Sequence, residues 1–321
     1  MGPWGIIALV VGAPAVLFLI FMLYAYRVAF YSPRRKELSD GYTLPSDPSY
    51  DGVRARYEDM KRAVREAPFE DVSVRSFDGL RLVGRYYERA PGAALHIIFH
   101  GYRSGPIGDG CGAFRITQER GHNLLAVYQR STGKSEGHTI TFGVHESEDV
   151  CTWARYACER FGSDTPIFLH GLSMGAATVL TASALDLPPN VVGIFADCGF
   201  TSPRAILCSV VRDMHYPVGL TYAVLRLAAR VFGRFDPEAR SALDAVTRAR
   251  IPIMFAHGED DHFVPFSMVR ELYEACASEK TLLTFPGAAH GMSYLSDTPR
   301  YEREAYAFVE RCLARYNARS I

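Results

Sequence analysis

The sequence predicts an α/β fold, a mostly parallel eight-stranded sheet with helices on both faces. From residue 95 onward, short apolar runs that suit buried strands alternate with segments of helical pattern. A Gly-x-Ser-x-Gly turn at 171–175 joins one such strand to a helix. The chain has 321 residues, of which 48% are hydrophobic, enough for one large domain with a sizeable core. Alternation of this kind is typical of parallel sheets that are covered on both faces.

Two antiparallel strands are predicted to come first, followed by strands that alternate with helices. Residues 72–77 and 80–87 alternate apolar and polar residues around an Asp-Gly turn, which predicts an antiparallel pair of strands. Further buried strands are predicted at 95–99, 123–128, 166–169, 191–196, 251–256 and 282–285. Helices are predicted at 147–161, at 176–185, at about 265–277, and from a cap at Thr298 towards Arg315.

A helical insertion interrupts the strands between about residues 201 and 250. Helices are predicted there at 205–214, 218–232 and 237–249. We expect a lid over the site, with Tyr216 and Leu220 on an inner face that forms an acyl-binding wall. The alternative is that these apolar side chains only pack on the sheet.

The first residues differ from the rest. No charged residue occurs from Trp4 to Tyr26, a run long enough to cross a bilayer as a helix. We expect a transmembrane anchor at 1–30, a linker and surface helix at 31–68, and the catalytic domain at 69–321. Basic residues follow the run and place that domain in the cytoplasm: Arg27, Arg34, Arg35 and Lys36. A cleaved signal peptide is the weaker alternative, because no basic region precedes the run.

The composition narrows the range of partners. Lys and Arg number 35 and Asp and Glu number 35, so nothing indicates a nucleic-acid partner. Seven cysteines without a Cys-x-x-Cys spacing predict free thiols in a reducing compartment. We expect no cofactor, and no metal, since His257 and His262 lack a third ligand at a suitable spacing. The sequence does not fix the oligomeric state.

The Gly-x-Ser-x-Gly turn makes Ser173 the candidate nucleophile. A serine hydroxyl needs a base within hydrogen-bonding reach and an acid that orients the base. His290 follows the last strand in a loop of small residues, and we expect it to be the base. Acidic residues follow the preceding strand at Glu259, Asp260 and Asp261, and another candidate, Asp197, follows the strand at 191–196.

Backbone amides are the expected donors to the oxyanion that forms during acyl transfer. One should be the amide of Met174, directly after the nucleophile, and the other the amide of Tyr102 in the loop after the strand at 95–99. We expect His100 to brace that loop. His100, Gly101 and Leu172 are also candidates for lining the substrate pocket.

These motifs resemble the α/β-hydrolase superfamily, in particular membrane-anchored bacterial serine hydrolases of the depalmitoylase-like and serine-aminopeptidase-like branches. The resemblance covers about residues 72–314 and rests on motifs at 100–102, 129–137, 171–175, 197–203, 257–265 and 288–291. It implies the α/β-hydrolase fold and selects Asp261 as the acid of the triad, with Asp260 as the alternative. It also implies hydrolysis of esters, thioesters or amides through an acyl-enzyme.

Three functions therefore compete. We expect a carboxylic-ester hydrolase whose substrate is a small acyl ester or a lipid-like molecule met at the membrane. An amidase or peptidase would need carboxylates near the pocket, for which Glu136, Glu146 and Glu148 are the candidates. A non-catalytic membrane scaffold on the same fold is the third, and the complete set of catalytic residues argues against it.

Overall fold

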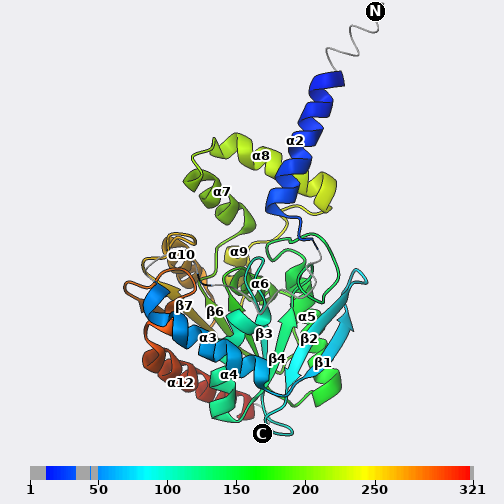
Figure 1. The fold of residues 1–321 in the computed structure, drawn as a ribbon. Helices are drawn as coiled ribbons and strands as arrows, with labels where there is room; N and C mark the ends of the chain where they lie inside the picture. Colours follow the sequence, from blue (N-terminus) through cyan, green and yellow to red (C-terminus); the bar gives the residue numbers. More distant parts are fainter. Residues whose placement is uncertain (1–11, 34–43, 45–49, 319–321) are drawn as a thin grey trace, which may run out of the picture.

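A computed structural model describes residues 12–33, 44 and 50–318 (Figure 1). Within this part of the chain the core is an eight-stranded sheet of order β1-β2-β4-β3-β5-β6-β7-β8. Its strands are β1 (Glu70–Arg75), β2 (Arg81–Tyr87), β3 (Leu95–Phe99), β4 (Asn123–Tyr128), β5 (Ile167–Leu172), β6 (Val191–Asp197), β7 (Ile253–Gly258) and β8 (Lys280–Phe285).

The sheet is mixed. Strand β2 pairs antiparallel with β1 and with β4, and all later pairs are parallel. The antiparallel hairpin and the parallel run were both predicted. Because parallel strands point the same way, the carboxyl ends of β3, β5, β6, β7 and β8 meet at one edge, where ligands bind in open α/β sheets.

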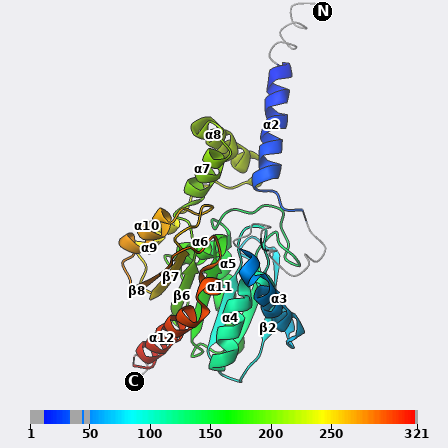
Figure 2. The ribbon, with the colours of Figure 1, turned by 60° about the vertical axis from the view of Figure 1, so that its left-hand side comes forward.

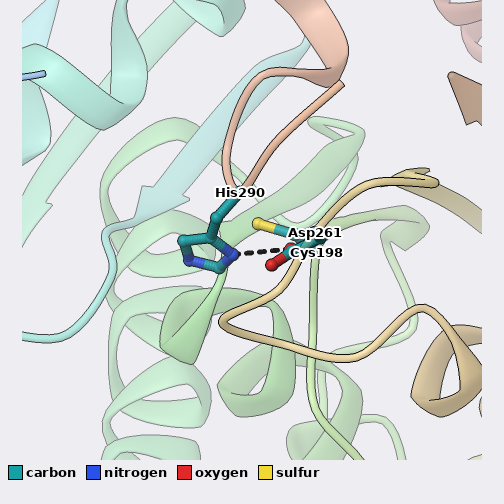
Figure 3. Close-up of side chains that lie close together, drawn as sticks. All are labelled: Cys198, Asp261 and His290. Carbon is teal, nitrogen blue, oxygen red and sulfur yellow. Dashed lines mark hydrogen bonds and ion pairs between the residues drawn. The ribbon is translucent and has the colours of Figure 1, made fainter. Parts of the chain in front are cut away.

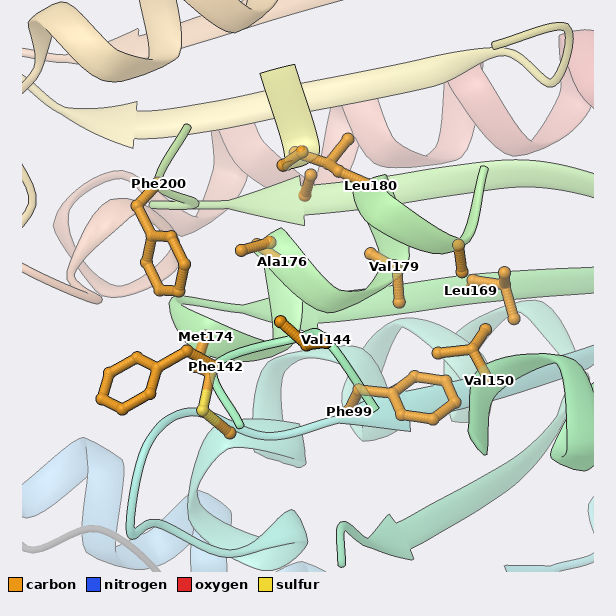
Figure 4. Packing of buried hydrophobic residues seen from close by; sticks show 14 of the residues in the cluster. Phe99, Phe142, Val144, Val150, Leu169, Met174, Ala176, Val179, Leu180 and Phe200 are labelled. Atoms are coloured by element: carbon orange, nitrogen blue, oxygen red, sulfur yellow. The ribbon is translucent and has the colours of Figure 1, made fainter. Parts of the chain in front are cut away.

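Helices cover both faces, as predicted. One face carries α5 (Glu146–Phe161), α6 (Met174–Ala182), α9 (Ala242–Val246) and α10 (Ser267–Ala275). Figure 4 shows the packing on this face, where α6 inserts Ala176, Val179 and Leu180 among side chains of the strands and of α5. The other face carries α3 (Asp51–Glu66), α4 (Pro106–Arg120), α11 (Ser293–Ser296) and α12 (Thr298–Asn317).

Four of these helices differ from expectation. Helices α4 and α11 were not predicted, and α3 is more than a surface helix, because it packs on α4 through Tyr57, Met60 and Val64. The cap of α12 is Asp297 and not Thr298, since the Asp297 carboxylate accepts a hydrogen bond from the backbone of Arg300.

The predicted insertion consists of α7 (Pro203–Asp213), α8 (Val218–Ala228) and a short π-helix, η3 (Ala229–Gly233), followed by α9. The third predicted helix, 237–249, is reduced to α9. Helices α7 and α8 stand above the sheet edge, and α8 packs beside the amino-terminal helix α2 (Ala13–Ala29) (Figures 1 and 2).

Helix α2 extends away from the domain in both views (Figures 1 and 2). Its large apolar side chains are mostly exposed, among them Leu17, Phe18, Ile20 and Phe21. The predicted membrane segment starts at Trp4, outside the described residues. Over the ranges that are described, no helix is both long enough and apolar enough to cross a membrane.

Candidate active site

Ser173 lies in a strained turn between β5 and α6, at the carboxyl edge of the sheet. Its φ angle is +55°, a left-handed conformation that non-glycine residues rarely adopt. The glycines on either side are required by packing. A Cβ atom on Gly171 would lie 2.2 Å from the carbonyl oxygen of Gly175, and one on Gly175 would lie 1.9 Å from that of Phe99. The turn therefore holds the Ser173 hydroxyl where a substrate can approach it.

His290 lies within hydrogen-bonding distance of the serine. Its Nε2 atom is 3.0 Å from Ser173 Oγ, and its Nδ1 atom is 2.7 Å from Asp261 Oδ2. Burial alone would raise the pKa of Asp261, but hydrogen bonds from His257 and His290 outweigh that effect and lower the pKa to about 2. An ionised carboxylate can only accept, so Nδ1 donates to Asp261, and Nε2 faces the Ser173 hydroxyl, where it can accept that proton.

Asp261 is fixed from several directions. Its Oδ1 atom accepts the backbone N–H groups of Phe263 and Val264, at 2.9 and 2.8 Å. Its Oδ2 atom is also 3.3 Å from Nε2 of His257, a buried side chain on β7. These contacts hold the carboxylate so that it can orient His290 and stabilise an imidazolium.

The competing carboxylates lie elsewhere. Glu259 and Asp260 are exposed on the same loop. Asp197 is buried and accepts a hydrogen bond from Ser293 Oγ at 2.7 Å. Of these side chains, Asp261 is the one that contacts His290 Nδ1.

Cys198 lies beside the hydrogen-bonded pair of Asp261 and His290. Cys198 Sγ, an Asp261 oxygen and a His290 nitrogen lie within 4.8 Å of one another, close enough to share a metal ion (Figure 3). The chemistry of these three side chains suits a hydrogen bond between Asp261 and His290 better than a metal site. Burial raises the pKa of the Cys198 thiol well above its usual range, whereas a metal binds the thiolate. His290 Nδ1 is already directed at Asp261.

The β3–α4 loop (residues 100–105) lies against the nucleophile. A Cβ atom on Gly101 would be 3.4 Å from Ser173 Cβ, and Gly101 and Tyr102 both line the cavity that contains Ser173. Met174 is the first residue of α6, where the backbone N–H has no acceptor within the helix. The loop and the start of α6 therefore flank the serine from two sides, as two oxyanion donors would.

Asp109 of α4 holds this loop and was not identified from the sequence. Its carboxylate accepts the Gly101 N–H at 2.6 Å and the Ser104 hydroxyl at 2.7 Å. Burial raises the pKa of Asp109 to about 6, despite the opposing effect of these hydrogen bonds. No sequence pattern marked it, since α4 itself was not predicted.

His100 braces the same loop, as expected, but it does not line the pocket. Its Nδ1 atom donates to the Gly101 carbonyl at 2.8 Å, and its Nε2 atom accepts the backbone N–H of Gln129 at 3.1 Å. Burial lowers its pKa to about 4, so the ring is neutral. Because the side chain is fully buried beneath the loop, the pocket role expected for His100 is not supported.

A cavity of about 360 Å³ opens beside Ser173 and His290. It extends between the sheet and the helices α3, α4 and α11, and its walls are mainly apolar and aromatic. They include Leu172, as expected, together with Tyr57, Ala113, Ile116 and Tyr294. The volume lies within the range of small-molecule sites.

The insertion does not form a wall of this cavity. Tyr216 and Leu220 are 55% and 70% exposed and are absent from its lining. The expected acyl-binding wall on α7 and α8 is therefore replaced by α3 and α4, on the other side of the site. The insertion packs on α2 instead of closing over Ser173.

The sequence profile of the prolyl oligopeptidase family matches residues 137–315, more than half of the chain. The chain belongs to the prolyl oligopeptidase family. The matched segment contains Ser173, Asp261 and His290, whereas the β3–α4 loop lies before it.

The relatives of this protein that can be named have low sequence identity to it. YqkD of Bacillus subtilis is 25% identical over 191 residues, which cover 59% of this chain and 63% of YqkD. The lysophosphatidylserine lipase ABHD12 of Danio rerio is 26% identical over 180 residues, 53% of this chain and 43% of the lipase. The chain thus matches less than two thirds of the length of either relative.

Solved structures agree on the fold. An esterase of Pyrococcus furiosus, Pf2001, superimposes with a TM-score of 0.65, 17% identity, and coverage of 88% of this chain and 98% of the esterase. At this identity the likeness concerns the fold alone. The family member therefore has the α/β-hydrolase fold, shared with hydrolases of the esterase and peptidase types.

Proposed function

We propose that this protein is a serine hydrolase that cleaves carboxylic esters with an apolar acyl group. The observation that carries the proposal is the continuous line of contacts from Ser173 Oγ through His290 to Asp261, with 3.0 and 2.7 Å between the bonded atoms. Ser173, the first residue of this line, lies in the wall of an apolar cavity. Acyl transfer requires a nucleophile, base and orienting acid in this geometry.

The reaction follows from the contacts. Ser173 attacks the ester carbonyl as His290 Nε2 takes its proton, and Asp261 stabilises the imidazolium that forms. The oxyanion of the tetrahedral intermediate accepts from the amides of Met174 and Tyr102. His290 then gives its proton to the leaving alcohol. Water, deprotonated by His290, attacks the acyl-enzyme, and the acid leaves as the bond to Ser173 Oγ breaks and His290 returns the proton to that oxygen.

The cavity supports the choice of an acyl substrate. Its walls offer aromatic and aliphatic surface from Tyr57, Ile116 and Tyr294, close to the nucleophile. Burial of an apolar chain there would contribute about 25 cal/mol for each Å² removed from water. The Danio rerio relative is described as a lysophosphatidylserine lipase, and such a lipid ester has an acyl chain of this character.

The family match keeps a peptidase or amidase as the second candidate. The carboxylates expected to hold a free amine are engaged elsewhere, which argues for the ester. Glu146 accepts the backbone N–H groups of Thr141 and Gly143. Glu148 pairs with Arg240, and Glu136 accepts from the backbone of Arg81. None of the three glutamates is among the described residues that line the cavity.

We also propose that residues 1–30 attach the protein to a membrane with the catalytic domain in the cytoplasm. The exposed apolar side chains along α2 and the basic residues after it support this proposal. All seven cysteines lie in the described ranges and are free, which suits a reducing compartment. Labelling of cysteines placed before Trp4 and after residue 318 in intact cells would test the orientation.

The catalytic proposal is tested with the full chain in detergent micelles. p-Nitrophenyl esters of increasing acyl length are compared with the p-nitroanilide of the best acyl group. We expect ester hydrolysis with a clear chain-length optimum, and a loss of about 10⁶-fold in kcat for Ser173→Ala. His290→Ala should fall to a similar level, because the two residues act as a unit.

The outcomes separate the candidates. Preferential cleavage of the anilide would favour the peptidase. No turnover of ester or anilide by the folded wild-type protein would contradict both enzymatic proposals and favour a scaffold role. Ester cleavage that persists in Ser173→Ala would contradict the assigned nucleophile.

A further inference from the structure

The carboxyl end of helix α2 is bonded to the β3–α4 loop. The hydroxyl of Tyr102 donates to the Ala29 carbonyl at 2.8 Å. Arg103 Nη2 donates to the carbonyls of Val28 and Tyr31, at 2.8 and 2.9 Å. The two segments are more than 70 residues apart in the sequence, so the contact is a tertiary one.

These bonds meet a need of the helix. The last carbonyl groups of a helix have no partner within it, and the helix dipole places partial negative charge there. Val28 and Ala29 are the last two residues of α2, and the arginine and tyrosine of the loop supply their donors. The same hydrogen bonds therefore cap the carboxyl end of α2 and attach the β3–α4 loop to it.

Aromatic packing strengthens the connection. The Tyr102 ring stacks on Phe142 at 5.1 Å between centroids, and Phe142 meets Phe30 edge to face at 5.9 Å. Phe30 follows α2 directly and is fully buried, and its carbonyl accepts the Ile140 N–H at 2.8 Å. The end of α2 is thus anchored in the domain and is not a loose tether.

The other side of the loop faces the reaction. Gly101 packs against Ser173 and is held by Asp109. Between these two sides, Arg103 has a φ angle of +52°, an unfavourable conformation for a residue with a side chain. Such a conformation persists when surrounding contacts impose it, and the bonds to α2 are contacts of this kind.

From this we infer that α2 positions the β3–α4 loop, and with it the backbone amide of Tyr102 that donates to the oxyanion. The side chains of Arg103 and Tyr102 are the positioning residues, because they bond the loop to the end of α2. The inference rests on the proposed function, because it concerns the donor that stabilises the tetrahedral intermediate. It adds a role for the amino-terminal helix in catalysis itself. An oxyanion donor acts through its place relative to the transition state, so a displaced loop lowers kcat and leaves ground-state binding nearly unchanged.

The test compares full-length Arg103→Ala, Arg103→Lys and Tyr102→Phe with wild type in the same micelles. Arg103→Ala should lower kcat by about 10- to 100-fold, less than the loss of a donor itself, with KM within about twofold. Arg103→Lys should recover part of the loss, since an ammonium group can reach the same carbonyls. Tyr102→Phe keeps the ring on Phe142 and should lose less than Arg103→Ala.

The affinity for a trifluoromethyl ketone provides a second measurement, and a loss of stability alone would not change it. It forms a tetrahedral oxyanion adduct with the serine, so its affinity should fall by the same factor as kcat/KM across the variants. Arg75→Ala is the matched control, because Arg75 also donates to a backbone carbonyl, that of Gly79, in the β1–β2 hairpin. It should match wild type in every measurement.

Each result decides the inference. Unchanged kcat in Arg103→Ala, or a loss confined to KM or to melting temperature, would overturn it while leaving the proposed function intact. If Arg103→Ala does not fold, Arg103→Lys and Tyr102→Phe decide by the same criteria. A wild-type protein that neither turns over esters nor binds the ketone would overturn both proposals.

Discussion

The carboxylate of Asp261 determines which ring nitrogen of His290 carries the proton in the proposed mechanism. The carboxylate accepts from Nδ1 and thereby leaves Nε2 free to accept the proton of Ser173. Asp261→Asn can donate from its amide to Nδ1, which favours the wrong tautomer of the ring. We expect kcat for ester hydrolysis to fall about 10⁴-fold with the fold intact. Steady-state kinetics beside circular dichroism check this, and a loss below tenfold would contradict the assigned acid.

Asp109 gives a prediction about pH. Burial raises its pKa from 3.8 to about 6, so the folded state holds this proton more tightly than the unfolded chain does. Its contribution to stability is therefore favourable at low pH and is lost as pH rises through this range. Asp109→Asn does not titrate, and its amide can still accept from Gly101 and donate to Ser104.

The stability of Asp109→Asn relative to wild type should therefore increase between about pH 4 and pH 6 and be constant above about pH 7. Chemical denaturation of both proteins at a series of pH values measures this difference, in which the other titrating groups cancel. A difference that does not vary with pH would show that the Asp109 pKa is not raised.

At the scale of elements, α4 shows why a helix can be missed. Its sequence contains Gly108, Gly110 and Gly112, and glycine is the second least favourable helix residue after proline. Packing explains two of these glycines: a Cβ on Gly110 would lie 3.1 Å from Ile98, and one on Gly112 would lie 3.0 Å from the Tyr294 ring. Tertiary contacts thus override local propensity, which a single sequence does not reveal.

Gly112→Ala tests this explanation. Helix propensity alone would stabilise the variant, but Tyr294 cannot retreat easily, because it packs on Tyr301 and bonds to Glu302. We expect a loss of about 1–3 kcal/mol in the free energy of unfolding. Gly52→Ala in α3, where a Cβ meets nothing within 4 Å, is the control and should gain up to about 1 kcal/mol. Equal gains in both variants would contradict the packing argument.

The same contrast separates what the sequence predicts at the site from what it does not. The positions of Ser173 and His290 follow from local signals, a turn between glycines and a small-residue loop after a strand. The places of Tyr216, Leu220 and His100 depend on where whole helices and loops pack. The apolar residues of the insertion indicate a buried surface, but not that α8 uses it against α2 and α7 instead of against the substrate.

For the whole molecule, the helices α3 and α4 and not the insertion should set the size of the acyl group. Ala113→Phe projects a ring from α4 into the cavity. We expect the optimal acyl chain to become shorter, with kcat/KM for the longest good substrate reduced by at least about tenfold. The ester series measures this directly.

Ala223→Phe is the matched control for that experiment, because it makes the same change at an exposed position of α8. Its chain-length profile should be that of wild type. A shift in Ala223→Phe with none in Ala113→Phe would place the acyl group under the insertion and contradict the assignment of the cavity.

Whether Ser173 is an activated nucleophile in an accessible site can be tested directly by covalent labelling. The full-length protein is treated with a fluorophosphonate, its mass is measured by intact-mass spectrometry, and the modified residue is identified by peptide mapping. We expect a single adduct on Ser173, absent in Ser173→Ala and formed much more slowly in His290→Ala. An unlabelled folded protein, or an adduct on another residue, would contradict it.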